Sequence, residues 1–587
     1  MTRATEREVD VVTMDVIGNA LEAISDEMFI TLQRTGRSMT ASQTNDMSAG
    51  IADAKGEIVS TGKRFGHTVA ASEALRNTLK KFAGRIDEGD VFIQNDPYSG
   101  SNHMPDVSVY KPVFVDGELC YFVHTVVHHS DIGGRSPGSL AHDATEIYQE
   151  GLRIPPIKLY SRGELNETLW DIIEKNTRGN SMKGDLRAQV AACFAGEAKL
   201  KELVHRYGQE QLHFYCEALK DYSERLVRAA ISEWPDGEYE FEDYIDEDGV
   251  DPDPILLHVK LTVKGDEVFA DYTGTSPQVR GSLNIAGVEG ISSVFGAIGA
   301  VANLETPNNS GVFRPIHVYA PPGSIVNMLE PASCGARGLT TYRLHDAWMG
   351  VLSKIAPDRV AAANEGGTST GRFGFIMPDR KYLVLYDNVY GSPGGRPDRD
   401  AYDGLGSGEG LGAGLTNASV EIIESRYPMR IRRYGFIPDT GGPGKHRGAL
   451  ALVREWEFLQ QSDFTFRSDR RRFRPYGLFG GEPGQPSSTY HNPDKEGEQL
   501  PAKMNTRFMG GEILSHITAA GGGWGDPLER EPQLVLEDYL EEKISLGHAR
   551  EAYGVVIDTH KVEVLADETS KLRQQMRRAH RSRSKKA

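Results

Sequence analysis

Two short segments in the N-terminal part of the chain hold the side chains that are best suited to bind a metal ion. The first reads NDPYSGSNHMPD and the second reads VHTVVHHSDIGG. Imidazole and carboxylate groups together suit zinc, manganese or iron, and a His-x-x-Asp pair can place two ligands on one turn or loop. The candidates are Asp96, His103, Asp106, His124, His128, His129 and Asp131. A single histidine of this kind is more often an ordinary strand or loop residue, but the set predicts a divalent metal centre.

A predicted β-hairpin brings the two segments together. Residues 107–115 and 118–127 are β-rich runs, and the Asp116-Gly117 dipeptide between them is typical of a two-residue hairpin turn. Strands joined by so short a turn lie side by side. The proximity of the two segments therefore follows from the turn alone.

The register of this hairpin decides which histidine joins Asp106, and the sequence leaves two alternatives. A plain two-residue turn pairs Asp106 with Val127. Because strand side chains alternate between faces, His129 then shares the face of Asp106. Pro112 in the first strand favours a bulge or an edge position, and one inserted residue would place His128 on that face instead. Both histidines therefore stay open as ligands.

Three polar residues in or just after the second segment could support the chemistry without binding the metal. We predict His124 and Asp131 as catalytic residues, because His124 could orient a ligand imidazole and Asp131 could accept a proton. Arg135 follows a Gly-Gly pair and could bind a phosphate or carboxylate through two hydrogen bonds. An ordinary structural or surface role is the alternative for each of the three.

Two glycine-rich motifs suggest other chemistries that their context argues against. GTSTG at residues 367–371 matches a serine hydrolase pattern, but the AAANEGG before it is not the apolar strand that a nucleophile elbow needs. GGPGKHRG at residues 441–448 resembles a phosphate loop, but His446 stands where Ser or Thr must bind magnesium. The chain shows no ATP-binding signature, so we expect a partner to bind ATP if the reaction uses it.

The order of patterns along the chain predicts an α+β, multi-domain protein with a β-rich centre and helical N-terminal and C-terminal segments. Helical periodicity runs through residues 10–35, 72–82 and 164–222. Strand-and-turn patterns run from 234 to 526, and a last helix starts near Pro532.

We divide the chain into three regions on this basis. They are an N-terminal α+β domain with the metal site (1–233), a strand- and glycine-rich central region (234–530) and a C-terminal helical segment with a basic tail (531–587). The tail could bind an acidic partner or RNA, although a solvated helix end that frays is the simpler interpretation.

Composition limits the class of protein and its location. With 39% hydrophobic and 25% charged residues, the chain of 587 residues has the balance of globular proteins. Its net charge of −17 argues against nucleic acid as the main partner. The four cysteines include no CxxC pair, which argues against a disulfide framework or a thiolate zinc site. A polar first segment and the lack of long apolar runs predict a cytoplasmic protein that does not cross a membrane.

Long stretches of the chain resemble the hydantoinase B/oxoprolinase family, which also includes the metal-bearing subunits of acetone and acetophenone carboxylases. The similar segments follow the family's order through residues 8–530. They include NDPYSGSNHMPDVSVYKPVF, HHSDIGG, ATEIYQEGLRIPPIKL, DYTGTSPQVRGSLN, PNNSGVFRPIHVYAPPGSIVN, DTGGPGKHRGA and GGGWGDP.

The resemblance implies both a ligand set and a partner. The family's metal ligands correspond to His103, Asp106 and His128, which favours His128 over His129. Asp46, in TNDMSAG, corresponds to an acidic residue of the family's first motif and could be a fourth ligand. The resemblance also implies a hetero-oligomer in which a hydantoinase A-type subunit binds ATP and phosphorylates a carbonyl oxygen of a small-molecule substrate. The B-type subunit would then complete the reaction.

Three functions are compatible with this resemblance. TNDMSAG lacks the glutamate, aromatic residue and cysteine that oxoprolinase-like members usually show, and the chain is short for an acetone carboxylase subunit. These departures favour carboxylation of an aromatic, acetophenone-like ketone through an enol phosphate. The alternatives are ATP-dependent hydrolysis of a cyclic amide of the hydantoin or 5-oxoproline type, and a non-catalytic scaffold for the ATPase partner.

Overall fold

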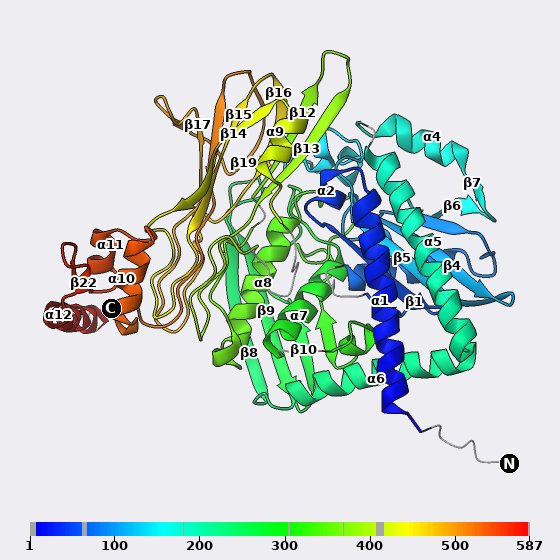
Figure 1. Ribbon diagram of the computed structural model, residues 1–587, viewed down its shortest axis with the longest axis horizontal. Helices are drawn as coiled ribbons and strands as arrows, with labels where there is room; N and C mark the ends of the chain where they lie inside the picture. The colour runs from blue at the N-terminus through cyan, green and yellow to red at the C-terminus, as the bar shows by residue number, and fades with distance from the viewer. Residues whose placement is uncertain are drawn as a thin grey trace.

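The helices and strands gather into three sheet-based bodies and a projecting arm (Figure 1). The structure is a computed structural model that describes residues 8–61, 67–179, 181–302, 306–367, 369–406 and 416–584. The predicted α+β class, with a β-rich centre between helical segments, is confirmed. Among the described helices, none combines the length and the apolar composition that crossing a bilayer requires.

The first body is built on a seven-stranded sheet with the strand order β2-β1-β5-β4-β3-β6-β7. Its strands are β1 (Met47–Asp53), β2 (Ile58–Ser60), β3 (Val91–Gln94), β4 (Asp106–Val115), β5 (Glu118–His128), β6 (Ile157–Ser161) and β7 (Glu164–Leu165). Its helices are α1 (Val11–Thr35), α2 (Met39–Ser42), α3 (Thr68–Lys81), α4 (Glu167–Asn176), α5 (Ser181–Tyr207) and α6 (Gln209–Ile231). Helices α1 and α5 pack on one face of the sheet, and α3 packs on the other.

Helix α1 confirms the periodicity predicted for residues 10–35. The Asp10 carboxylate caps the helix by accepting a hydrogen bond from the Thr13 N–H at 3.2 Å. One stripe of the helix is buried against α5 and β1 and comprises Met14, Ile17, Leu21, Ile24, Met28 and Leu32. Because β1 pairs with β5, this packing also holds the hairpin in place.

The second body is a four-stranded sheet with the order β11-β10-β9-β8 and two helices packed against it. Its elements are β8 (Gly237–Ile245), β9 (Ile255–Lys264), β10 (Glu267–Asp271), α7 (Gly287–Ala302), β11 (Ile316–Tyr319) and α8 (Gly338–Leu352). The sequence does not predict the two helices. Every residue of α8 except Tyr342 is buried, so the helix lacks the polar face from which a helical period is recognised.

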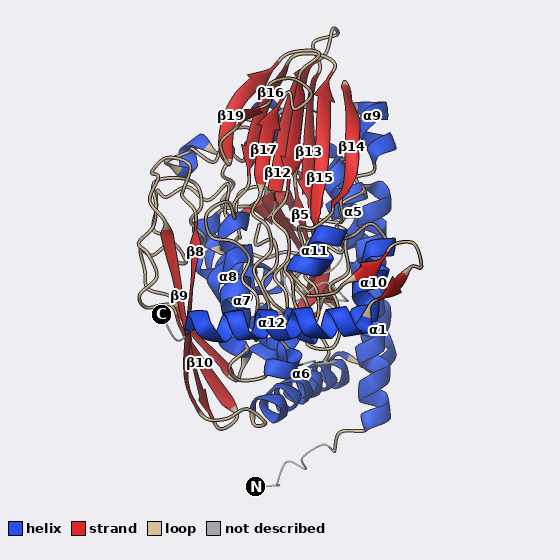
Figure 2. Cartoon of the chain, turned by 90° about the vertical axis from the view of Figure 1, so that its left-hand side faces the viewer, coloured by secondary structure: helices blue, strands red, loops and turns tan. Residues whose placement is uncertain are grey.

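The third body is a pair of sheets with the orders β13-β12-β16-β19 and β14-β15-β20-β17-β18, whose strands run side by side in Figure 2. The strands are β12 (Ser369–Ile376), β13 (Tyr382–Val389), β14 (Met429–Ile437), β15 (Ala451–Phe458), β16 (Ser462–Arg467), β17 (Ser488–His491), β18 (Glu498–Gln499), β19 (Lys503–Phe508) and β20 (Ile513–Ile517), with helix α9 (Val420–Arg426). Aromatic side chains fill the space between the sheets, as where Phe373 and Trp456 lie 5.8 Å apart between ring centres.

The predicted strand- and glycine-rich central region, 234–530, contains two sheet-based bodies. The GTSTG motif runs into β12, where Thr370 and Gly371 pair with residues of both β13 and β16. A residue between two paired strands does not sit on the sharp turn of a nucleophile elbow. The described part of this motif is therefore a sheet segment.

The glycine-rich run at 441–448 packs against the C-terminal GGGWGDP segment. The Gly442 N–H donates to the Gly521 carbonyl oxygen at 2.8 Å. A Cβ atom on Gly448 would lie 2.1 Å from the same oxygen, so only glycine allows this approach. The run is a backbone-to-backbone junction, and its resemblance to a phosphate loop is superficial.

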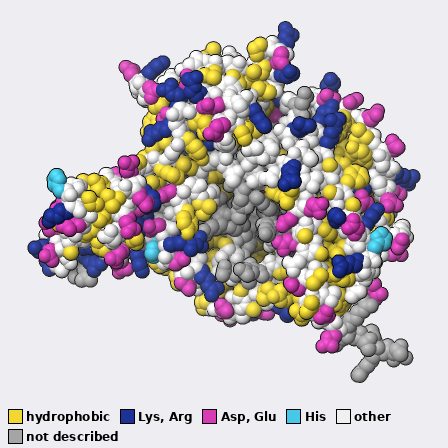
Figure 3. Space-filling model, in the orientation of Figure 1, with side chains coloured by type: hydrophobic (Ala, Val, Ile, Leu, Met, Phe, Trp, Pro, Cys, Tyr) yellow, Lys and Arg dark blue, Asp and Glu magenta, His cyan; other side chains and the backbone are white. Residues whose placement is uncertain are grey.

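The C-terminal arm projects from the third body (Figure 1). It comprises α10 (Pro532–Leu540), α11 (Leu546–Glu551), β21 (Ile557–Asp558), β22 (Glu563–Val564) and α12 (Ala566–Ser584) around a small core of its own. Buried Arg530 anchors the arm, because it pairs with Asp400 at 2.6 Å and with Asp538 at 2.7 Å. On the face in Figure 3, charged side chains gather densely on this arm. The basic tail belongs to α12, which is helical to Ser584.

Candidate metal centre

A bulge in the hairpin determines which histidine meets Asp106. Near the turn the strands pair as the Asp-Gly dipeptide predicts, with Val115 opposite Glu118 and Phe114 opposite Leu119. The next pair joins Val113 to Tyr121, so Cys120 is an extra residue in β5. From there on the register is shifted by one residue.

The shifted register places His128 directly opposite Asp106. This is the inserted-residue alternative that the sequence left open, although the bulge lies in β5 rather than at Pro112. Residues of β5 with even numbers then face away from α5, together with Asp106. His129 faces α5, where its Nε2 lies 3.0 Å from Gln189 Oε1. His129 is therefore held as a structural residue.

Three ligand-type atoms converge at the end of the hairpin. His103 Nε2 lies 3.1 Å from His128 Nδ1 and 3.1 Å from Asp106 Oδ1. His128 Nδ1 lies 3.0 Å from the same Asp106 oxygen. All three side chains are almost fully buried. The cluster predicted from the two segments is thus assembled in space.

The spacing and chemistry of this cluster suit a divalent cation. Ligands about 2.1 Å from one ion and at right angles to each other lie about 3.0 Å apart, close to the separations seen here. Burial, reinforced by Arg337, lowers the pKa of His103 well below its usual range, so the imidazole is neutral and has a lone pair available. Burial alone would raise the pKa of Asp106, but His103 and Arg337 outweigh it and hold that pKa well below its usual range. Neutral imidazoles with a carboxylate match zinc, manganese or iron.

Asp46 lies beside the cluster rather than within it. Its Oδ2 is 3.9 Å from His128 Nδ1, and its backbone oxygen accepts a hydrogen bond from the His128 N–H at 3.0 Å. The tight group whose ligand atoms all lie within 4.8 Å of one another comprises His103, Asp106 and His128. Asp46 is positioned to approach an ion from the side of His128, as the proposed fourth ligand.

Two arginines from distant parts of the chain border the cluster, and neither is predicted from the sequence. Arg337, at the start of α8, donates to Asp106 Oδ2 at 2.9 Å and also binds Glu289 of α7. Arg372, on β12, places its Nη2 3.0 Å from His128 Nε2. Their positions lie more than two hundred residues beyond the hairpin. No local pattern links them to it.

The two predicted catalytic residues make other contacts. His124 is fully buried beside Gly50 and Tyr110, and neither ring nitrogen has a hydrogen-bond partner among the described residues. Burial lowers its pKa to about 4. Asp131 accepts hydrogen bonds from the Gly133 and Gly138 N–H groups and pairs with Arg178 at 3.1 Å. This geometry makes Asp131 the anchor of the Gly-Gly loop.

Arg135 and a second acidic cluster are already paired with charged side chains of this chain. Arg135 pairs with Asp143 at 2.9 Å on the surface. Asp53, Glu57 and Glu217 also lie within metal-binding distance of one another, but the Lys220 ammonium sits among them at 2.6 to 3.1 Å. The lysine already supplies a positive charge at the centre of that cluster.

Comparison with known proteins identifies the family of this chain. The family profile described as hydantoinase B/oxoprolinase matches residues 10–527. This chain belongs to the hydantoinase B/oxoprolinase family. The predicted resemblance is confirmed.

Similar proteins extend over nearly the whole length of this family member. It is 34% identical to a protein assigned as the B-type subunit of a D-/L-hydantoinase from Pseudomonas sp. (strain NS671), over 97% of this chain and 98% of the relative. The crystal structure of ATP-dependent caprolactamase from Pseudomonas jessenii is similar with a TM-score of 0.91 and 30% identity, over 97% of this chain and 100% of that one. A nucleotide-free acetone carboxylase structure shares the fold, with a TM-score of 0.90, 18% identity, and coverage of 98% and 84%.

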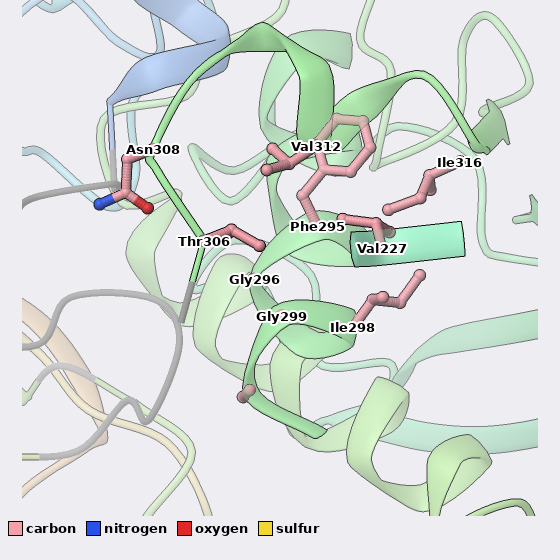
Figure 4. A pocket seen from close by; sticks show the side chains of 10 residues that line it. Val227, Phe295, Gly296, Ile298, Gly299, Thr306, Asn308, Val312 and Ile316 are labelled. Atoms are coloured by element: carbon pink, nitrogen blue, oxygen red, sulfur yellow. The ribbon is translucent and has the colours of Figure 1, made fainter. Parts of the chain in front are cut away.

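Two cavities lie outside the metal cluster. One of about 710 Å³ is lined by residues of α3 and α7, including Glu73, Arg76 and Asn77. The other, of about 250 Å³, is lined by Phe295, Ile298 and other apolar side chains, with no charged group among its described lining residues (Figure 4). The lining of the cavity in Figure 4 includes none of the three ligand residues, and its apolar character does not suit a charged ligand.

Glu150 holds the segment that leads to Arg337. Its Oε1 accepts hydrogen bonds from the Ser333 hydroxyl and from the N–H groups of Cys334 and Gly335. Burial raises the pKa of Glu150 to about 7, although these hydrogen bonds oppose the shift. Since the folded pKa lies above the ordinary value of 4.5, the protonated form favours folding. Stability should therefore fall as the pH rises between these two values.

Replacing Glu150 with glutamine should remove that pH dependence. We expect the wild-type chain to lose up to about 3 kcal/mol of unfolding free energy between about pH 5 and pH 8, because each pKa unit corresponds to about 1.4 kcal/mol. The E150Q variant should lose little over the same range. Urea unfolding at several pH values measures the difference, and the exposed Glu146→Gln change is the matched control. Equal slopes for the wild type and E150Q would contradict this assignment.

Proposed function

We propose that this chain is the metal-bearing subunit of an ATP-dependent enzyme that opens a cyclic amide after a partner subunit has phosphorylated the amide oxygen. The observation that carries the proposal is the buried meeting of His103, Asp106 and His128. Support for the substrate class comes from two relatives at 30% identity or more, whose names describe one subunit of a hydantoinase and an ATP-dependent caprolactamase. Hydantoin and caprolactam are both cyclic amides.

A divalent ion held by His103, Asp106 and His128 would supply Lewis acidity to a carbonyl or phosphoryl oxygen. The chain's own residues prepare that site. Arg337 binds the second oxygen of Asp106 and so fixes which oxygen faces the cluster. Burial excludes bulk water from the ligands, which strengthens each electrostatic interaction there.

We infer that a hydantoinase A-type partner binds the ATP. The run at 441–448, which resembles a phosphate loop, is a junction whose described glycines pack on backbone. The 34% identical relative is named as one subunit of its hydantoinase, which agrees with a multi-subunit enzyme. A hetero-oligomer, a small-molecule carbonyl substrate and a cytoplasmic location remain part of the proposal.

Carboxylation of an aromatic ketone is the second candidate. It is favoured by the TNDMSAG segment, which lacks the glutamate, aromatic residue and cysteine of oxoprolinase-like members. The same ligands could orient bicarbonate or CO2 against an enol phosphate. The similarity to acetone carboxylase concerns the fold alone, at 18% identity, so we rank this reaction second.

The two candidate reactions differ in whether carbon from bicarbonate enters the product, and the scaffold alternative differs from both in lacking a bound metal. We expect the purified chain to hydrolyse no ATP, and the chain with its partner and ATP to open a hydantoin or lactam ring. Product analysis with labelled bicarbonate is the measurement. Label incorporated into the product would favour carboxylation. ATP hydrolysis by this chain alone would contradict the division of work between the subunits. A purified chain without bound metal would favour the scaffold alternative.

A further inference from the structure

Arg372 reaches from the third body to the metal cluster of the first. Its side chain is 1% exposed and lies over the ring of Tyr386, which stacks on His128 with 5.2 Å between ring centres. Its Nη2 is 3.0 Å from His128 Nε2. The arginine and the tyrosine therefore cover the side of His128 that faces away from the cluster.

The guanidinium of Arg372 is buried with unused donors. Its Nε and Nη1 atoms have no hydrogen-bond partner among the described residues. Among the described residues no carboxylate pairs directly with it; Asp46 attracts it from farther away, and Arg467 adds a like charge nearby. Such a group is costly in a folded chain unless an anion binds to it.

The hydrogen bond between Arg372 and His128 depends on which nitrogen of the ring carries the proton. With the proton on Nδ1, His128 can donate to Asp106, and its Nε2 can accept from Arg372. When Nδ1 binds a cation through its lone pair, the proton of the neutral ring is on Nε2. Two donors, Nε2–H and the Arg372 N–H, then face each other across 3.0 Å. An oxygen that accepts from both would relieve this conflict.

We propose that Arg372 and the Nε2–H of His128 together bind the phosphoryl group of the activated substrate, and that they do so when the metal centre is loaded. This proposal rests on the proposed function and names the part of the substrate that the chain recognises. Arg135, the arginine that the sequence suggests for binding an anion, pairs with Asp143 on the surface. Arg372 takes that role beside the ligands.

The charges around the centre agree with an anionic ligand. The acidic groups are Asp46, Asp106 and Glu289, and the basic groups around them are Arg337 and Arg372, with Arg467 close to both arginines. Their charges balance in the metal-free chain. A divalent cation would leave the site positive, which favours a phosphoryl group over a neutral amide. Asp46 opposes the anion, but it lies 3.9 Å from His128 Nδ1, where the cation would attract it.

Phosphate binding to the full-length chain tests this role without an activity assay. We expect inorganic phosphate to bind the metal-loaded wild type, and Arg372→Gln to weaken that affinity about 10- to 100-fold, since a hydrogen bond to a charged group contributes about 1.5–3 kcal/mol. Calorimetry measures the affinity, and metal analysis checks that the variant keeps its ion. Arg135→Gln, an exposed arginine, is the control and should bind as the wild type does.

Three further readouts separate ligand binding from a structural role. Phosphate should raise the affinity for the metal by the same factor by which the metal raises the affinity for phosphate. R372Q should be at least as heat-stable as the wild type, because it removes a buried charge; a lower melting temperature would indicate a structural arginine. Arg372→Lys should bind phosphate with intermediate affinity, because lysine keeps the positive charge but lacks the planar guanidinium that donates two parallel hydrogen bonds.

The outcomes distinguish this inference from the proposed function. Equal phosphate affinity in metal-loaded wild type and R372Q would overturn the inference and leave the metal centre intact. Tighter binding of bicarbonate than of phosphate would overturn the phosphoryl assignment and favour carboxylation. A wild-type chain that binds phosphate through Arg372 but holds no metal would contradict the proposed function and the metal dependence, while it would support the anion site itself.

Discussion

Replacing His103 with alanine should deprive the chain of its metal ion and the assembled enzyme of its activity. His103 Nε2 lies 3.1 Å from both other ligand atoms, and the site is buried, so no nearby described histidine or water-exposed group is placed to substitute for it. Loss of a residue that merely orients a ligand costs about 10- to 100-fold in metal affinity, and loss of a ligand should cost more. Asp106→Ala and His128→Ala should behave alike.

Histidine 129 supplies the matched control for this experiment. His129→Ala removes an equally buried neighbour of His128, but its ring lies against Gln189 on the other face of β5. We expect the H129A variant to keep its metal. Elemental analysis of the purified variants measures the stoichiometry. Metal loss in H129A with retention in H128A would show that the unshifted hairpin register is the true one.

Replacing Asp469 with alanine should destabilise the chain by about 3 kcal/mol, because it removes a buried carboxylate shared by two buried cations, Arg343 and Lys503. The two cations would then depend on Asp243 and Glu247. Asp469 accepts from Arg343 at 2.6 Å and from Lys503 at 3.2 Å, and all three side chains are at most 1% exposed. Arg343 lies on α8 of the second body and Lys503 on β19 of the third. The variant should therefore loosen the contact between these two bodies as well as lower the melting temperature.

The pH dependence of this effect follows from the pKa of Asp469. Burial alone would raise that pKa, but Lys503 and Arg343 outweigh it and lower the pKa below 3.8. A carboxyl of this kind stabilises the fold above its unfolded pKa and loses the effect as the pH falls through the folded value. The wild type and D469A should therefore converge only below about pH 4.

Asp379 offers the surface control for D469A. Its side chain is 52% exposed and pairs with Lys381, so Asp379→Ala should change the unfolding free energy by no more than about 0.5 kcal/mol. Thermal and urea unfolding of both variants make the comparison. Similar stability of D469A and D379A would mean that the buried ion network contributes little.

Local patterns accounted for much of the fold. The stripe from Met14 to Leu32 predicted α1, because one face of that helix is buried and the rest is solvated. The same reasoning missed α7, and it failed for α8 because that helix is buried on nearly every side and therefore lacks an exposed face. The residues between 234 and 530 were predicted as one region, since glycine-rich turns do not reveal which strands share a sheet.

The sequence by itself determined that His103, Asp106 and a histidine of the second segment would meet, because an Asp-Gly turn returns the chain antiparallel to itself. Only the tertiary structure decided between His128 and His129, since the bulge at Cys120 depends on how β5 packs between β1 and β4. It alone brought Arg337 and Arg372 to the site. Contacts between segments more than two hundred residues apart are set by how whole sheets and helices pack, and no local spacing encodes them.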